Sequence, residues 1–247
     1  MKDNSIKMTK MEEKKINKMI KEMNLPDSIN KTLLFVSLCH TSYVFEKENK
    51  GRKINSNERL EFLGDSVLEL IISEFLYNNY SLSEGDMSKI RATVGSELIL
   101  AEAALEINLN KYIFLGLGED KHGGREKHSI LSDAMESHIA SIYLSLGFDF
   151  TKDYVLNILN KYIKKAIKGE LFLDYKTRLQ EITQEVFKVL PEYKIMNSEG
   201  PSHYKYYKIA VIVKEKVYGI GEGHSKKIAE QLAAKKACER LTKNEEN

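Results

Sequence analysis

The spacing of apolar residues changes once along this chain of 247 residues, and the change limits the possible folds more than any other feature. Up to about residue 173, apolar residues recur at helical spacing, without a clean strand-like alternation. Farther on, an apolar or aromatic side chain occupies every second position from Tyr207 to Val213, which predicts a strand. The sequence therefore predicts an all-α domain followed by a small α+β domain with the order α-β-β-β-α.

Cap and turn signals divide the small domain further. A helix is expected from Lys176 to Val189, where Pro191 closes it. Ser225 can cap a last helix that runs to about Leu241. Three glycines are expected to punctuate the chain between the strands and this helix: Gly219, Gly221 and Gly223.

The expected segments are a charged leader (1–25), the all-α domain (26–168), a linker (169–174), the small domain (175–242) and a tail (243–247). Four apolar residues of the leader could form one face of a weak amphipathic helix: Ile16, Met19, Ile20 and Met23. A frayed, solvated leader is an equal alternative, in which Pro26 marks the start of the packed domain.

Composition excludes several classes of protein. Cys39 and Cys238 lie far apart and form no framework, which excludes a disulfide scaffold and a cysteine zinc site. The first residues lack the apolar segment of a secretory signal, and no stretch approaches the roughly 18 apolar residues that a membrane span needs. We therefore expect a reducing, cytoplasmic setting without a membrane partner.

The net charge of +2 taken alone argues against a nucleic-acid-binding protein. The two parts of the chain differ, however. Residues 174–247 carry 14 Lys and Arg against 11 Asp and Glu, whereas residues 1–173 carry 24 against 25. The total therefore averages a mildly basic second domain with a slightly acidic first one.

Carboxylates are concentrated on one expected helix, which contains Asn57–Leu68. At about 100° per residue, Glu58, Glu61 and Asp65 share one face of it. The rest of the helix is apolar nearly all round, which indicates burial, and a buried carboxylate needs a cation. Arginine and lysine partners are one possibility: Arg59, Lys89 or Arg91. A metal ion is the other.

A second expected helix, Ser129–Tyr143, favours the metal. Asp133 and Glu136 are three residues apart and therefore share a face. Small residues beside them allow a neighbouring helix to come close. Two carboxylate pairs on facing helices make an all-oxygen site that suits Mg²⁺ or Mn²⁺ rather than zinc, and such sites cleave phosphodiesters. His138 points off this face, so we interpret it as a packing or interface residue.

Three polar clusters in the small domain suit double-stranded RNA, which is recognised by its shape through two minor grooves and the phosphates between them. Thr177, Gln180 and Gln184 form a polar face on the opening helix. The second cluster is the segment Glu199–His203. The third leads into the last helix, where Lys226, Lys227 and the helix N-terminus favour phosphate.

At this point the sequence resembles bacterial ribonuclease III. The segment NERLEFLGDSVL at residues 57–68 is similar to the family signature. The segments LL at 33–34 and CHTSY at 39–43 resemble an earlier family motif, with Cys39 where threonine is usual. EGDMSKIRA, GGR…SIL, GPSH and GEGHSKKIAEQLAAKKA also match, so that the resemblance extends over roughly residues 26–241. The second acidic motif departs modestly, with Ser132 and Ser137-His138 at positions where alanine and apolar residues are usual.

The resemblance implies a Mg²⁺-dependent homodimer that cleaves double-stranded RNA, including ribosomal RNA precursors. Glu61, Asp133 and Glu136 would bind the metal, while Asp65 would help to position the attacking water. Phe62 would insert into the partner subunit beside Glu58. The RNA-contacting positions would be Thr177, Gln180, Gln184, His203, Lys226 and Lys227.

Two other functions stay open. A protein that binds double-stranded RNA without cutting it would be expected to lack some of the four carboxylates, and none is missing. A metal phosphohydrolase for small substrates would leave the second domain without a function.

Overall fold

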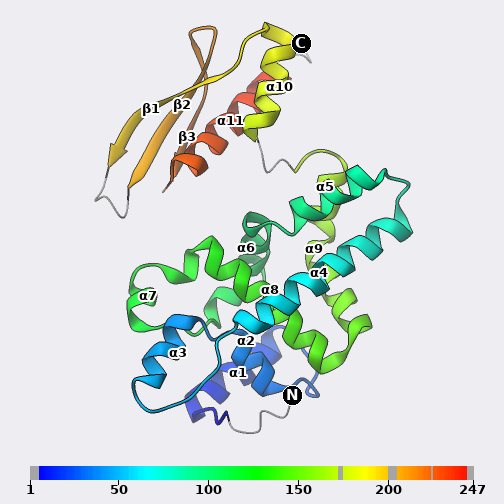
Figure 1. Cartoon of the computed structure of the whole chain (residues 1–247), viewed down its shortest axis with the longest axis vertical. Helices are drawn as coiled ribbons and strands as arrows, with labels where there is room; N and C mark the ends of the chain where they lie inside the picture. Colours follow the sequence, from blue (N-terminus) through cyan, green and yellow to red (C-terminus); the bar gives the residue numbers. More distant parts are fainter. Residues whose placement is uncertain (1–5, 172–174, 200–204, 224, 244–247) are drawn as a thin grey trace. The chain divides into compact units, whose positions relative to one another are not determined.

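The computed structural model describes residues 6–171, 175–199, 205–223 and 225–243. The chain forms two compact units, Met1–Leu171 and Phe172–Asn247. The first unit is α-helical and the second contains a three-stranded sheet with helices (Figure 1). The predicted order of an all-α domain and an α-β-β-β-α domain is therefore confirmed.

The helices of the first unit pack against one another rather than against a sheet. They are α1 (Lys10–Glu22), α2 (Lys31–Ser37), α3 (Thr41–Glu48), α4 (Glu58–Asn79), α5 (Glu84–Val94), α6 (Glu97–Glu106), α7 (Leu117–Lys121), α8 (His128–Leu146) and α9 (Phe148–Ile167), with the 3₁₀ turns η1 (Leu109–Lys111) and η2 (Gly124–Glu126). No helix in the described part of the chain is both long and apolar enough to cross a bilayer.

Helix α8 lies at the centre of the first unit and packs against α2, α4, α6 and α9 (Figure 1). Leu131, Met135 and Ile139 on it are completely buried. Helix α4 runs along α8 but, contrary to the nearly all-round burial expected for it, has an exposed apolar side: Phe62, Leu70 and Tyr77 are 79%, 56% and 76% exposed. Apolar composition alone does not distinguish a buried helix from one that keeps an apolar strip for another partner.

Helix α1 resolves the two interpretations of the leader. It is an ordered helix, begun by a capping box between Thr9 and Glu12. Its residues Ile16 and Met19 are completely buried, and α1 packs against α2. The packed unit thus includes α1 instead of beginning near Pro26.

The second unit is one antiparallel sheet in the order β1-β2-β3, backed by two helices (Figure 1). Its elements are α10 (Tyr175–Phe187), β1 (Glu192–Glu199), β2 (Tyr206–Val213), β3 (Lys216–Gly223) and α11 (Lys226–Lys243). On β2, Ile209, Val211 and Val213 are buried, as their alternation predicts. Helix α11 packs on β3 and α10 around them.

The glycines expected to punctuate the chain lie inside β3 instead. A Cβ atom at Gly221 would come within 2.0 Å of the Ala229 carbonyl oxygen, and one at Gly219 within 2.2 Å of the Ala233 carbonyl oxygen. The backbone of α11 therefore lies directly on a strip of the strand without side chains. The turn between β2 and β3 is formed by Lys214 and Glu215 in the left-handed region, with φ of 46° and 66°.

Candidate active site and nucleic-acid interface

The four predicted carboxylates come from two helices in close contact, α4 and α8. A Cβ atom at Gly64 would lie 1.9 Å from the carbonyl oxygen of Glu136, so no other residue fits there without moving a helix. Gly64 lies between Glu61 and Asp65 in the sequence. The contact thus brings the acidic turn of α4 against the acidic turn of α8.

Asn57 joins these helices to the rest of the unit. Its backbone N–H donates to the carbonyl of Cys39 at 2.9 Å, and its own carbonyl accepts from the N–H of Glu61 at 2.9 Å. The hydroxyl of Ser137 on α8 donates to the carbonyl of Asp133, and the same hydroxyl lies 3.4 Å from the carbonyl oxygen of Asn57. Ser137 stands where alanine is usual in the family that the sequence resembles. It is therefore accommodated as a buried hydrogen-bond donor.

The electrostatics of the site show carboxylates near one another and, among the described residues, no ion pair that offsets their charge. Burial raises the pKa of Glu136, and the charges of Asp65, Glu61 and Asp133 raise it further, to about 8. Burial also raises the pKa of Glu61, with Asp133 as the second cause. The pKa of Asp133 is raised by burial, partly offset by a hydrogen bond from Ser132.

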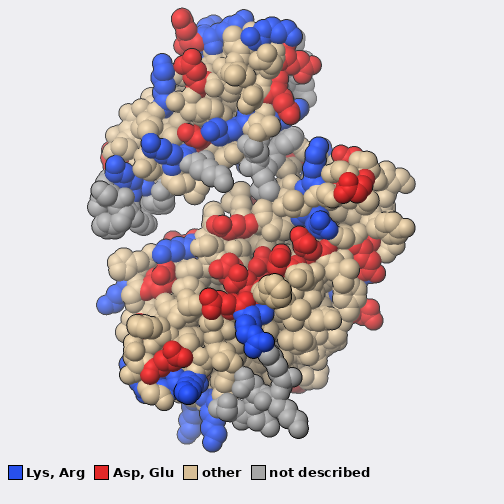
Figure 2. Space-filling model, in the orientation of Figure 1, with Lys and Arg blue, Asp and Glu red and all other residues tan. Residues whose placement is uncertain are grey.

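The arginine and lysine alternative receives no support from the described residues, among which none of the four carboxylates forms an ion pair. Arg91 instead contacts Glu69 on α4 and donates to the hydroxyl of Ser73. Acidic side chains gather on one face of the first unit, in the region of α4 and α8 (Figure 2). Like charges that are held together without a protein cation fit a bound divalent cation.

Within the described residues, no three His, Cys, Asp or Glu side chains are already close enough to hold one ion. The donor set itself, four carboxylates on two helices in contact, has the oxygen chemistry of a Mg²⁺ site.

Sequence reasoning assigned no function to His40 and Gly64, although both lie in the motifs quoted. His40 caps α3, and its ring nitrogen Nδ1 lies 2.8 Å from the hydroxyl of Ser42. Burial lowers the pKa of His40, while Glu119 and Asp133 raise it. The signal for Gly64 was available: a glycine inside an apolar helix is costly unless another backbone approaches it.

His138 is a packing residue of this chain. It is completely buried on α8, and its Nε2 atom lies 2.9 Å from the hydroxyl of Tyr154 on α9. The two rings meet edge to face with centroids 5.6 Å apart. His138 thus ties α8 to α9 on a side of α8 away from the four carboxylates.

Three of the predicted RNA-contacting residues, Thr177, Gln180 and Gln184, are exposed along α10. Lys226 is exposed at the start of α11, with its Nζ atom 6.0 Å from the centre of the Tyr207 ring. The hydroxyl of Ser225 accepts from the N–H of Ile228, so that Ser225 caps α11 as predicted. Lys227 lies in α11, and His203 falls outside the described residues.

The predicted dimer residues Glu58 and Phe62 are both exposed at the start of α4. Beyond them, a groove of about 440 Å³ runs between α4 and α5. It is lined by residues that include Leu70, Tyr77 and Met87. The exposed apolar side of α4 thus continues into this groove.

Comparison with known proteins gives matches over both units. A family described as Ribonuclease-III-like matches residues 30–162, and the double-stranded RNA binding motif matches residues 175–241. Ribonuclease 3 of Pseudothermotoga lettingae is 45% identical over 85% of this chain and 89% of its own length. Ribonuclease 3 of Clostridium tetani is 45% identical over 92% of this chain and 99% of its own.

A solved structure agrees for the first unit. The nuclease domain of ribonuclease III from Campylobacter jejuni superposes with a TM-score of 0.53 at 38% identity, over 60% of this chain and 97% of that one. That structure is described as showing flexibility in a region involved in dimer formation.

Proposed function

The chain belongs to the ribonuclease III family and is an endoribonuclease of double-stranded RNA, and we propose that it depends on Mg²⁺, for which Mn²⁺ can substitute. Glu61, Asp133 and Glu136 would hold the cation. When bound, the cation supplies an activated water and positive charge for the departing oxygen. The observation that carries this proposal is the close contact of α4 with α8 at Gly64 and Glu136, which brings four carboxylates together with no ion pair to any of them among the described residues. Burial and the other three carboxylates raise the pKa of Glu136 to about 8.

The protein contributes position and charge to the reaction. Asp65 accepts a hydrogen bond from the attacking water and aligns it with the phosphorus. A bond forms between the water oxygen and phosphorus, the bond from phosphorus to the 3′ oxygen breaks, and a proton of the water ends on that oxygen. The products carry a 5′-phosphate and a 3′-hydroxyl, and the protein forms no covalent intermediate.

A homodimer would place two such sites on one duplex. A duplex has two antiparallel strands related by local two-fold symmetry, so that a two-fold dimer can cut both and leave short 3′ overhangs. Phe62, 79% exposed, and Glu58 would contact the partner subunit. The exposed Leu70 and Tyr77 on the same helix support an interface there.

The second unit would hold the duplex. Thr177, Gln180 and Gln184 on α10, together with His203, would contact the minor grooves. Lys226 and Lys227 would bind phosphates where α11 begins. Ribosomal RNA precursors and other structured RNAs, including precursors of messenger and transfer RNA, would be the substrates, and the cytoplasm would be the place of cleavage.

The test is the substitution Glu136→Gln, which removes one carboxylate and keeps the shape of the side chain. We expect cleavage of a long duplex in Mg²⁺ to be lost by at least about 10³-fold. Binding of the duplex should stay within about twofold, because Glu136 is proposed to hold the metal and is none of the residues proposed to contact the duplex. Glu102→Gln, an exposed acid on α6, is the matched control and should cleave normally.

The outcomes separate the competing functions. Normal cleavage by the Glu136→Gln variant would show that the metal site is assigned wrongly. Binding of the duplex by the wild type, without cleavage in Mg²⁺ or Mn²⁺, would favour a protein that only binds RNA. Hydrolysis confined to small phosphodiesters would favour the third function.

A further inference from the structure

Helix α1 carries a row of four exposed lysines: Lys10, Lys14, Lys18 and Lys21. At about 100° per residue they fall within about 80° of the circumference of the helix. At about 1.5 Å per residue the row is about 16 Å long. We refer to these four residues as the lysine row of α1. It is a basic strip on a unit whose sequence is slightly acidic.

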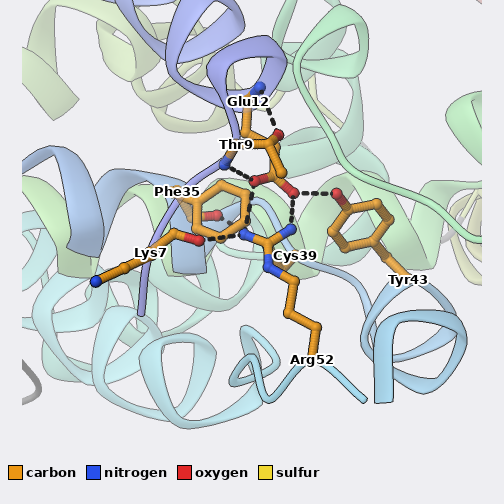
Figure 3. Close-up of polar contacts among 7 residues, drawn as sticks. All are labelled: Lys7, Thr9, Glu12, Phe35, Cys39, Tyr43 and Arg52. Atoms are coloured by element: carbon orange, nitrogen blue, oxygen red, sulfur yellow. Dashed lines mark hydrogen bonds and ion pairs between the residues drawn. The ribbon is translucent and has the colours of Figure 1, made fainter. Parts of the chain in front are cut away.

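The lysine row is held in a fixed orientation by the opposite side of α1. Glu12, only 4% exposed, accepts hydrogen bonds from both terminal nitrogens of Arg52, at 2.6 Å and 2.7 Å, and from the hydroxyl of Tyr43 (Figure 3). Arg52 also donates to the carbonyl of Lys7 at 2.5 Å (Figure 3). A ligand that binds the row therefore meets a helix that is already ordered.

Lys15, on the inner side, shows by contrast what a structural lysine of α1 looks like. Its ammonium donates to the carbonyl of Ile113 at 3.1 Å and lies 4.4 Å from the centre of the Phe114 ring. Burial lowers its pKa to about 8. None of the four lysines of the row has a comparable contact with the body of the unit in the described structure.

The charges of the row are largely unused within the described chain. Only Lys18 forms an ion pair there, with Glu22 at 3.5 Å on the same helix. Other lysines of the unit do pair across elements, such as Lys152 with Glu74 and Lys127 with Glu119. Three of the four charges in the row therefore remain available to an anion from outside.

We propose that the lysine row of α1 binds the phosphate backbone of double-stranded RNA, outside the stretch that is held at the four carboxylates. This inference rests on the proposed function, which makes a duplex the substrate. Lysines four residues apart are about 6 Å apart along the helix, and a duplex offers a dense series of phosphates to such a row.

Other polyanionic partners fit the row less well. Basic helices that lie on anionic membranes insert an apolar side, whereas Ile16, Met19 and Ile20 of α1 are already buried in the unit and Met11 is the one large apolar side chain of this helix that is mostly exposed. Protein interfaces are usually centred on buried aromatic residues, and the lysine row contains none. A polyanion that is contacted through charge alone is what the row can bind.

The experiment neutralises the row in the full chain: Lys10→Gln, Lys14→Gln and Lys21→Gln together. The control neutralises three exposed lysines of the same unit that form no ion pair in the described structure: Lys31→Gln, Lys50→Gln and Lys165→Gln. Binding to a duplex long enough to extend beyond the cleavage site is measured in a chelator at several salt concentrations. All six positions are exposed, so both variants should keep the wild-type melting temperature.

We expect the row variant to bind at least about fivefold more weakly at low salt, with the slope of log K against log[salt] reduced by about 2 to 3, because each lost phosphate contact removes about one unit. The control should lose less than one unit of slope. Cleavage at saturating RNA should be unchanged in both. If the row variant melts at a lower temperature than the wild type, the single substitution Lys14→Glu replaces it in the test. This substitution should also weaken binding to the duplex and reduce the slope of log K against log[salt].

Wild-type affinity and slope in a folded row variant would overturn the inference. So would a variant that keeps RNA binding but no longer binds vesicles of anionic lipid that the wild type does bind. A wild type that fails to cleave any duplex would instead contradict the proposed function. The salt titration measures binding without catalysis, so a failure of the proposed function can be distinguished from a failure of this inference.

Discussion

The missing side chain at residue 64 decides how close α4 comes to α8. Glu61 and Asp65, on either side of it, would be carried away from Asp133 and Glu136 if the two helices moved apart. A glycine inside a helix costs about 0.5–1 kcal/mol relative to alanine. Here that cost is offset by a contact that a Cβ atom, 1.9 Å from the Glu136 carbonyl oxygen, would prevent.

We predict that Gly64→Ala destabilises the first unit by about 3 kcal/mol or more, because the atoms that it meets belong to the backbone. Urea unfolding measures the loss, and cleavage should fall even where the unit is folded. Gly118→Ala is the control, since nothing lies within 4 Å of its Cβ atom. Equal stability of the two variants would contradict the close approach.

Glu12 is the residue that makes the folding of α1 sensitive to acid. Burial raises its pKa, but hydrogen bonds from Arg52, Tyr43 and Thr9 outweigh burial and lower the pKa to about 2, from 4.5. A carboxyl group whose pKa is lowered by folding stabilises the protein above its unfolded pKa. That stabilisation is lost as the pH falls from about 4.5 towards 2.

We predict that Glu12→Gln is less stable than the wild type at neutral pH, and that the difference in the free energy of unfolding shrinks between pH 4.5 and 2. Chemical unfolding over this range gives the difference at each pH. Glu13→Gln, the exposed neighbour, serves as the control. A difference that did not change with pH would show that the ion pair does not stabilise α1.

At the scale of elements, the strand β3 and the helix α11 pack closely because the residues at their contact have small side chains or none. Ala229, Ala233 and Ala237 of α11 are completely buried. They lie over Gly219 and Gly221, whose missing side chains leave room for the helix backbone. This close packing fixes the position of α11 relative to the sheet, and with it the position of the exposed Lys226 at the start of the helix.

We predict a graded effect of alanine along this strip. A Cβ atom at position 221 would meet backbone atoms, whereas one at position 223 would meet Ile228 Cγ2 at 2.6 Å, in a side chain that is 42% exposed and can rotate. Gly221→Ala should cost the second unit about 3 kcal/mol, and Gly223→Ala less. Urea unfolding and RNA binding of both variants check this order; a reversed order would contradict it.

Local patterns predicted the elements, whereas contacts between distant residues decided what the patterns left open. The spacing of Glu61, Asp65, Asp133 and Glu136 predicted two acidic helices because it depends on helix geometry alone. The place of α1 depends on Glu12 and Arg52, which are 40 residues apart in sequence and show no pattern together. The glycines of β3 were misread for the same reason: their partner, α11, is not visible locally.

At the scale of the molecule, the two units differ in charge and in function, and the net charge of the whole chain does not show this difference. The first unit gathers carboxylates where we propose that a cation binds, and its slightly acidic sequence reflects them. The second unit is mildly basic and matches a double-stranded RNA binding motif. Bound metal would offset part of the negative charge of the acidic site, which helps a nearly neutral chain to act on a polyanion.

Cleavage of a long RNA duplex, with the ends of the products mapped, tests the central claim most directly. In Mg²⁺ we expect products with a 5′-phosphate, a 3′-hydroxyl and short 3′ overhangs, and no cleavage once a chelator is added. Cleavage that continues in the chelator, or a cyclic or 3′-phosphate end, would contradict hydrolysis by water at a metal held by Glu61, Asp133 and Glu136.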